Sequence, residues 1–275
     1  MNEALIGVEW KRNLSMQLKI LLAPMLVLAL AASLPGQVPD PSPADPPAQT
    51  DRPVSWTKLV PNLASDQKQI WTFPTKLGKR KYWIPAVAIV GVTAGLVALD
   101  PVTAPYFRRT SSFDGFNRVF SGNATSIGTI VAPVSLYAAG LIRKDSKMQS
   151  TALLAGEAVA NAEILTVAMK DVDRRLRPAD IAPNGDFSDS WFRDNKRYLR
   201  SNGSFPSGHT IAAFSVATVV SRRYGTEHRW VPYVAYGAAA LVGFSRMTLS
   251  SHFPSDVLMG AALGYSISRF TVLRD

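Results

Sequence analysis

The tetrapeptide Pro206-Ser207-Gly208-His209 opens an apolar segment that continues to Val220. Ser207 is a favourable N-cap residue, and Gly208 allows an anion to approach the backbone N–H groups at the start of a helix. The segment is longer than a typical strand, and its Ala and Ser content suits close contact between helices. We therefore expect a helix here, with an anion-binding site at its first turn.

Five further apolar segments of similar length surround this one in the sequence. Their lengths favour helices over strands, and their small residues again favour close helix–helix packing. Together the segments predict an all-α fold, a six-helix bundle. They are Tyr82–Leu99, Ile127–Ile142, Ala152–Met169, His209–Val220, Val231–Leu249 and Val257–Val272.

The composition narrows the chemistry that these 275 residues can perform. The chain has no cysteine, which excludes disulfides, thiolate zinc sites, iron–sulfur clusters and a cysteine nucleophile. It has three histidines, too few for most all-histidine metal sites. The formal charge of +10 suits an anionic partner, which by composition alone is nucleic acid, acidic lipid or a phosphorylated substrate.

The N-terminal part of the chain resembles a targeting segment. Basic residues precede the apolar run Ile20–Ala32, and small residues lie near its end, which is the order found in secretory signals; a short membrane anchor is the alternative. Seven prolines then follow within Leu34–Pro53. We expect a signal-like or anchor segment over 1–34, a Pro-rich disordered linker and pre-domain segment over 35–75, and the helical domain over 76–275.

The sequence contains evidence both for and against a bundle of six helices that crosses a membrane. Glu157, Asn161 and Glu163 lie within Ala152–Met169 and favour a soluble domain, since in a bilayer they would have to face the bundle interior. The loops Arg143–Lys147 and Arg222–Arg229 are basic and would share one side of the membrane, which favours insertion. A cleaved signal would invert that arrangement. We expect a membrane-embedded bundle, with a soluble secreted domain as the alternative.

A second motif, Lys-x6-Arg-Pro, runs from Lys170 to Pro178. Lys170 and Arg177 are seven residues apart and would share one helix face, and Pro178 predicts that the helix ends at Arg177. This gives a cationic edge at a helix end. The alternative is a solvated face, on which Asp171 and Asp173 pair with the neighbouring Arg174 and Arg175.

A third motif, Ser245-Arg246-x5-His252-x3-Asp256, bridges the last two predicted helices. Pro254 suits the first turn of the final helix, so that His252 precedes it and Asp256 lies within its first turn. The Asp256 carboxylate can accept a hydrogen bond from one ring nitrogen of His252, which fixes the tautomer and makes the other nitrogen more nucleophilic. Arg246 supplies a planar guanidinium for phosphate oxygens.

The three motifs, in this order, resemble the tripartite signature of the type 2 phosphatidic acid phosphatase superfamily, which includes bacterial class A acid phosphatases and vanadium haloperoxidases. The resemblance covers roughly residues 82–272 and implies a metal-free reaction through a phosphohistidine, without a cofactor. It implies that His252 is the nucleophile, that Asp256 orients it and that His209 is the general acid. It also implies a phosphate-binding set, namely Lys170, Arg177, Ser207, Gly208 and Arg246.

The resulting prediction is a phosphatase that acts on a lipid phosphate, of the phosphatidate or polyprenyl diphosphate type. Its partners would be this phosphorylated lipid, or a small phosphoester, and a membrane rather than nucleic acid. We expect an inner-membrane protein of a bacterial envelope with its site facing the periplasm. The alternatives are a soluble acid phosphatase that is periplasmic or secreted and, less in keeping with the chain length, a vanadate-dependent haloperoxidase.

Overall fold

The computed structural model describes residues 52–194 and 203–274, and every regular element in these two ranges is a helix. The predicted all-α class is therefore confirmed for this part of the chain. The signal-like segment 1–34 and most of the Pro-rich stretch lie outside the described residues.

Each of the six predicted segments corresponds to a long helix. Two short helices, α2 and α4, were not predicted, so the expected count of six was too low. The elements are η1 (Trp56–Lys58), α2 (Leu59–Trp71), η2 (Phe73–Lys76), α3 (Arg80–Arg109), α4 (Asp114–Val119), α5 (Gly122–Arg143), α6 (Ser146–Asp173), η3 (Pro178–Asp180), α7 (Gly208–Tyr224), α8 (Val231–Thr248), α9 (Pro254–Ser266) and the π-helical turn η4 (Ile267–Val272).

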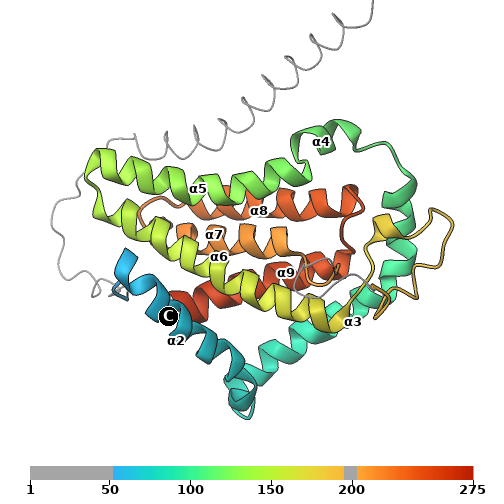
Figure 1. Ribbon diagram of the computed structural model, residues 1–275, viewed down its shortest axis with the longest axis horizontal. Coiled ribbons are helices and arrows are strands. Elements are labelled where there is room, and N and C mark those ends of the chain that lie inside the picture. Colours follow the sequence, from blue (N-terminus) through green and yellow to red (C-terminus); the bar gives the residue numbers. More distant parts are fainter. Residues whose placement is uncertain (1–51, 195–202, 275) are drawn as a thin grey trace, which may run out of the picture.

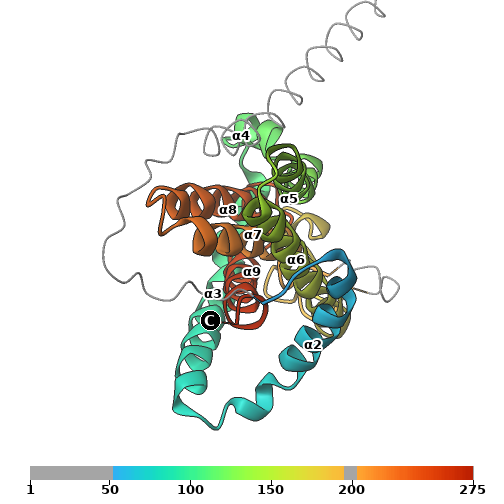
Figure 2. The same cartoon turned by 90° about the vertical axis from the view of Figure 1, so that its left-hand side faces the viewer.

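Helix α7 lies at the centre of the bundle. It packs against α5, α6, α8 and α9 (Figure 1), and the view along the bundle shows these helices around it (Figure 2). The chain reverses direction from one helix to the next. As a result, the end of α6, the start of α7, the end of α8 and the start of α9 meet at one end of the bundle.

Two glycines allow α9 to approach α7 closely. A Cβ atom at Gly260 would lie 2.8 Å from the carbonyl oxygen of Ser207, and one at Gly264 would overlap the carbonyl oxygen of Ile211. Gly260 and Gly264 lie four residues apart on one face of α9, the small-xxx-small spacing that brings helix backbones together. This contact places the tetrapeptide at the start of α7 beside the first turn of α9.

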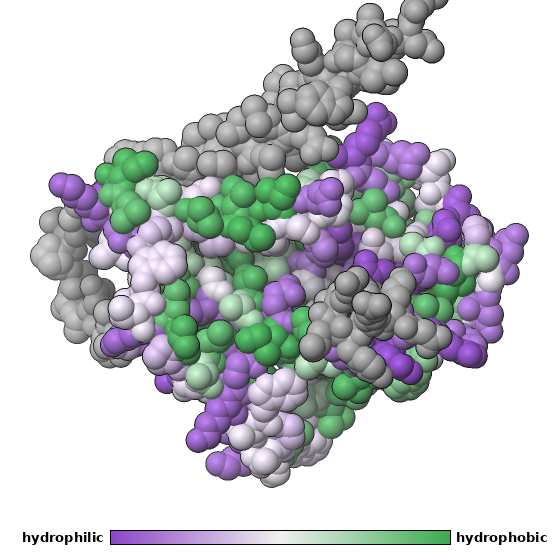
Figure 3. Space-filling view, viewed as in Figure 1, coloured by the Kyte–Doolittle hydropathy of each residue, from purple (hydrophilic) through white to green (hydrophobic). Residues whose placement is uncertain are grey.

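Within residues 52–194 and 203–274, three helices are long and apolar enough to cross a membrane. They are α3 from Tyr82, α5, and α6 with the residues that follow it to Asp180, with mean hydropathies of 2.0, 1.6 and 1.4 over 18 residues. Only 6% and 17% of the first two windows is buried inside the protein. Hydrophobic side chains are exposed along α5 and over the middle of α6 (Figure 3), as on the lipid-facing surface of a membrane protein.

Two of the three polar residues of α6 that favoured a soluble domain, Glu157 and Asn161, are buried against α2. Glu157 accepts a hydrogen bond from Asn62 at 2.8 Å and pairs with Arg52. Arg52 also pairs with Asp66 at 2.6 Å, and Asp66 accepts from Asn161 at 2.9 Å. Glu157, Asn161 and Asp66 therefore have partners inside the protein, so they do not require a soluble domain.

Candidate active site

The three motifs meet at the end of the bundle where α7 begins. The backbone N–H of Ser207 donates to the carbonyl of Asp256 at 3.0 Å, which joins the second motif to the third. The N–H of Ala179, just after the first motif, donates to the carbonyl of Ser250 at 2.8 Å. The predicted site residues therefore come together, although they are spread over more than 80 positions of the chain.

His252 is buried, with 3% of its surface exposed, and its Nδ1 lies 2.6 Å from the backbone carbonyl oxygen of Ser204. A carbonyl oxygen only accepts hydrogen bonds, so Nδ1 carries the proton and Nε2 keeps its lone pair. Burial, together with the positive charges of Lys170 and Arg177, lowers the pKa of His252 to about 4, although Asp256 acts in the opposite direction. His252 is therefore neutral at pH 7, as a nucleophile must be.

Asp256 lies in the first turn of α9, as predicted, with its Oδ2 3.6 Å from Nδ1 of His252. That distance is longer than an ordinary hydrogen bond, so the shorter contact of Nδ1 is the one to Ser204. The same carboxylate oxygen accepts from the hydroxyl of Ser204 and, at 2.7 Å, from the N–H of Phe253. Asp256 therefore holds Ser204, whose carbonyl in turn holds the imidazole.

His209, the second residue of α7, points toward the start of α5. Its Nε2 lies 2.6 Å from the hydroxyl of Ser126 and 3.3 Å from the carbonyl oxygen of Gly122. The start of α5 thus forms one wall of the site, a contribution that the motifs do not indicate.

Three cationic side chains come from separate elements. Lys170 and Arg246 are buried, with 6% and 1% of their surfaces exposed. Arg246 donates from Nη2 to the carbonyl of Phe120 at 2.8 Å and from Nε to the hydroxyl of Ser245 at 3.0 Å. The charges of Lys170 and Arg177 act on His252, and those of Lys170 and Arg246 act on His209, so the three cations lie near the two imidazoles.

Ser207 occupies the N-cap position of α7, as predicted, but its hydroxyl makes no capping bond. Instead it accepts from the hydroxyl of Thr210 at 2.8 Å. Gly208 is buried and leaves room beside the carboxylate of Glu163, which lies 3.7 Å from where its Cβ would stand. The start of α7 is therefore held by packing rather than by a hydroxyl cap.

The helix of the first motif ends earlier than Pro178 predicted. Helix α6 stops at Asp173, because Arg174 adopts a left-handed conformation with φ of 43°. Beyond it the backbone turns to the loop that follows, and the N–H of Leu176 donates to the carbonyl of Ser190 at 2.8 Å. Lys170 is thus in the last helical turn, whereas Arg177 lies on an extended segment rather than on the same helix face.

Sequence reasoning missed four polar residues around the site: Ser126, Ser204, Arg175 and Asp100. The alternative that placed Arg175 on a solvated face was wrong, since 1% of this residue is exposed. The sequence could have indicated a role for Asp100, because burying an acidic residue next to a long apolar segment costs free energy unless it has a partner. Its partner could not be read from the motif.

The site thus combines a neutral imidazole, a second imidazole and three cations, a set that can hold a tetrahedral oxyanion and attack it. Among residues 52–194 and 203–274, no group of three or more His, Asp or Glu side chains is placed to hold a metal ion. Independence from metals stays a prediction.

Comparison with known proteins places these motifs in one family. The family model described as the PAP2 superfamily matches residues 151–274, which include all three motifs. A lipid A 1-phosphatase from Porphyromonas gingivalis is 44% identical over 70 residues, which is 24% of this chain and 16% of that protein. Phosphatidylglycerophosphatase B from Bacillus subtilis is 39% identical over 108 residues, which is 37% of this chain and 46% of that protein. The matches therefore span less than half of either relative.

A solved structure gives a weaker match. The crystal structure of a transmembrane PAP2 type phosphatidylglycerolphosphate phosphatase from Bacillus subtilis has a TM-score of 0.40 and 18% identity; the match covers 78% of this chain and 92% of that one. On the family match and the motifs it contains, residues 151–274 form a domain of the PAP2 superfamily.

Proposed function

We propose that this protein is a metal-independent phosphatase that hydrolyses a phosphomonoester or pyrophosphate of a lipid, of the phosphatidate or polyprenyl diphosphate type. The observation that carries the proposal is the geometry of His252. Its Nδ1 is fixed by the Ser204 carbonyl, which leaves Nε2 with a free electron pair in a site where the charges of Lys170 and Arg177 act on the imidazole.

In the first step, Nε2 of His252 attacks the phosphorus atom and a P–N bond forms as the bond to the leaving oxygen breaks. Burial lowers the pKa of His209 to about 4, so the negative charge of the bound phosphate must raise this pKa before His209 can act as the acid. His209 then donates a proton to that oxygen, so that the lipid leaves as a neutral alcohol or as a monophosphate. Lys170, Arg177 and Arg246 neutralise the charge on the three equatorial oxygens.

In the second step, water attacks the phosphohistidine and the P–N bond breaks. His209, now neutral, takes a proton from the water, and inorganic phosphate leaves. His252 returns to its neutral form and His209 to its protonated form, so the cycle consumes one water molecule for each phosphate released.

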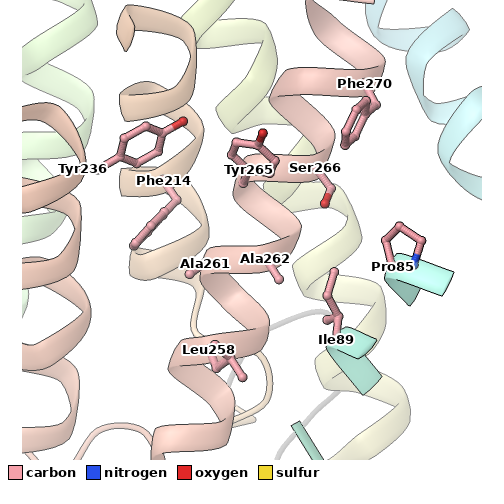
Figure 4. A pocket seen from close by; sticks show the side chains of 10 residues that line it. All are labelled: Pro85, Ile89, Phe214, Tyr236, Leu258, Ala261, Ala262, Tyr265, Ser266 and Phe270. Atoms are coloured by element: carbon pink, nitrogen blue, oxygen red, sulfur yellow. The ribbon is translucent and has the colours of Figure 1, made fainter. Parts of the chain in front are cut away.

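A lipid substrate is supported by an apolar groove between α3, α7, α8 and α9 (Figure 4). The groove encloses about 440 Å³ and is lined by Ile89, Phe214, Tyr265 and other apolar side chains. Leu258 at one end lies two residues after Asp256 in α9, so the groove reaches within one helical turn of the catalytic end. The names of the two relatives, a lipid A 1-phosphatase and a phosphatidylglycerophosphatase, also favour a lipid phosphate.

We infer a location in a bacterial inner membrane, with the site facing the periplasm. The support is the charge of the opposite end of the bundle, where the basic segments after α5 and α7 lie. Lys147, at the start of α6, forms an ion pair there with Glu227 of the loop after α7. An excess of basic residues in short loops marks the cytoplasmic side.

A phosphate-release panel tests the proposal. The detergent-solubilised protein is assayed in EDTA with phosphatidate, a polyprenyl diphosphate and a small chromogenic phosphoester, beside the variants His209→Ala and His252→Ala. His228→Ala is the matched control, because His228 lies in the loop after α7, at the far end of the bundle from the site.

The expected result is phosphate release from the lipids, abolished in the two site variants and retained in the control. Loss of wild-type activity in EDTA would overturn the metal-free mechanism. Release from the small ester alone, by protein that stays soluble without detergent, would favour the acid phosphatase instead. Halide oxidation that requires added vanadate, without phosphate release, would favour the haloperoxidase.

A further inference from the structure

Arg175, two residues before the motif residue Arg177, forms the centre of a buried hydrogen-bond network. Its Nη1 donates to Oδ1 of Asp256 at 2.6 Å and to the hydroxyl of Ser255 at 2.8 Å. Its Nη2 donates to Asp100 of α3 at 2.6 Å. The guanidinium therefore bridges two carboxylates that are themselves fully buried.

Two aromatic rings fix the plane of this guanidinium. Its central carbon lies 3.9 Å from the ring centroid of Phe253 and 4.3 Å from that of Trp191. Contact with two ring faces suits the flat, delocalised cation of Arg better than the compact ammonium of Lys. The residue is thus held in one orientation by its shape as well as by its charge.

Arg175 also reaches the nucleophile through Ser204. Its backbone carbonyl accepts from the N–H of Ser204 at 2.8 Å, and the Asp256 carboxylate that it binds accepts from the Ser204 hydroxyl. The carbonyl of the same Ser204 then lies 2.6 Å from Nδ1 of His252. Ser204 is therefore held from two sides by groups that depend on Arg175.

We propose that Arg175, anchored by Asp100, is the positioning residue that fixes the reactive tautomer and orientation of His252. The kinetic test of this role rests on the proposed phosphatase function. Removal of the guanidinium would leave Asp100 and Asp256 buried without their shared cation. Asp256 would then shift or take up a proton, and Ser204 would lose its fixed position. Substrate binding should change little, because the guanidinium of Arg175 is buried and is bound to Asp100, Asp256 and Ser255.

The test compares Arg175→Gln with Arg193→Gln. Arg193 lies in the loop that also carries Trp191, and its ion pair with Asp189 is exposed, so the same substitution there serves as the control. We expect Arg175→Gln to lower kcat by roughly 100-fold, with KM changed by less than about threefold. In protein labelled with 15N-histidine, the Nδ1–H signal of His252 should disappear or become a mixture of tautomers. The control should match the wild type in both measurements.

Two milder variants keep the proposal testable if Arg175→Gln does not fold. Arg175→Lys keeps the charge but cannot bridge both carboxylates, and Asp100→Asn keeps the shape of its partner. Each should lower kcat by roughly tenfold or more with KM almost unchanged. A wild-type kcat with an unchanged tautomer in these folded variants would overturn the proposal, as would a loss confined to KM.

The proposed function can fail independently of this inference. If the wild type releases no phosphate from any substrate, the function is wrong, whereas the tautomer of His252 still reports on Arg175. A wild-type tautomer in the folded Arg175 variants would then refute the positioning role without any kinetic measurement.

Discussion

The Nδ1 atom of His252 lies 2.6 Å from the backbone carbonyl oxygen of Ser204. Because the acceptor is a main-chain atom, it is present whatever side chain stands at position 204. The tautomer of the nucleophile thus depends on where the backbone of this loop is held. Substitutions at position 252 can therefore separate the role of Nδ1, which is structural, from that of Nε2, which is chemical.

Replacing His252 by Asn makes this separation. The amide N–H of Asn stands about where Nδ1–H does and can still donate to Ser204, but no atom replaces Nε2. We expect kcat to fall by roughly four orders of magnitude or more, because the residue that attacks phosphorus is gone. Binding of inorganic phosphate, followed by 31P NMR titration, should stay within a few-fold of the wild type. Retained turnover would show that another group is the nucleophile.

The pH dependence of kcat/KM should report the low pKa of His252, which burial lowers to about 4. Above this pH the imidazole is neutral and Nε2 can attack; as the pH falls through about 4 it takes up a proton and kcat/KM declines. Lys170 and Arg177 lower this pKa and Asp256 raises it, so Lys170→Gln should move the acid limb to higher pH. The measurement is kcat/KM from pH 3 to 8. An acid limb near pH 6.5 would indicate a solvated histidine.

The contact between α7 and α9 should be sensitive to a single methyl group. A Cβ atom at Gly264 would overlap the carbonyl oxygen of Ile211, so Gly264→Ala must push the helices apart. We expect a loss of about 1–3 kcal/mol in the free energy of unfolding, and reduced kcat because α7 and α9 carry His209 and Asp256. Both are measured in detergent, by thermal unfolding and by phosphate release.

Gly237→Ala is the matched control for that substitution. Gly237 lies within α8, and no atom stands within 4 Å of where its Cβ would be. The change should be neutral or stabilise the helix by up to about 1 kcal/mol. Equal effects of the two substitutions would show that close packing at Gly264 is unimportant.

Local sequence patterns predicted the long helices and the motif residues that meet where α7 begins. The apolar segments predicted the six long helices, because each of these helices has a face that is buried in the protein or exposed to lipid. Pro254 predicted where α9 begins. The left-handed Arg174 that ends α6 was not predictable from the motif, since only Pro178 carried a local stop signal. The hydrogen bond from Leu176 to Ser190 holds the chain just after the end of α6. A local sequence pattern does not contain such a contact.

Arg175 and Asp100 show the same limit within the site. They lie 75 positions apart, and each alone looks like an ordinary charged residue near a helix end. Only the packing of α3 against α9 brings Asp100 to the guanidinium. Helix α2 escaped prediction for a related reason, because its one fully buried residue, Asp66, is polar and its partner Asn161 lies 95 positions away.

That polar contact gives the last prediction, Asp66→Asn in α2. Asp66 is fully buried and accepts from Arg52 at 2.6 and 2.8 Å, so loss of its charge leaves a buried cation short of one partner. Breaking a buried pair in this way costs roughly 3–5 kcal/mol of unfolding free energy. Because α2 lies against the middle of α6, away from His252, we expect lower thermal stability in detergent with kcat/KM almost unchanged below the unfolding temperature.

Lys68→Gln is the control for Asp66→Asn, since Lys68 lies on the exposed face of the same helix. The double variant with Arg52→Gln distinguishes pairing from a general defect. If the two side chains act together, the second substitution should add far less than its own effect, with a coupling of about 0.5–3 kcal/mol. Additive losses, or equal stability of Asp66→Asn and Lys68→Gln, would mean that α2 is held by its apolar contacts alone. In that case the buried charges of α6 would lower the stability of the fold and would not be what holds α2 against α6.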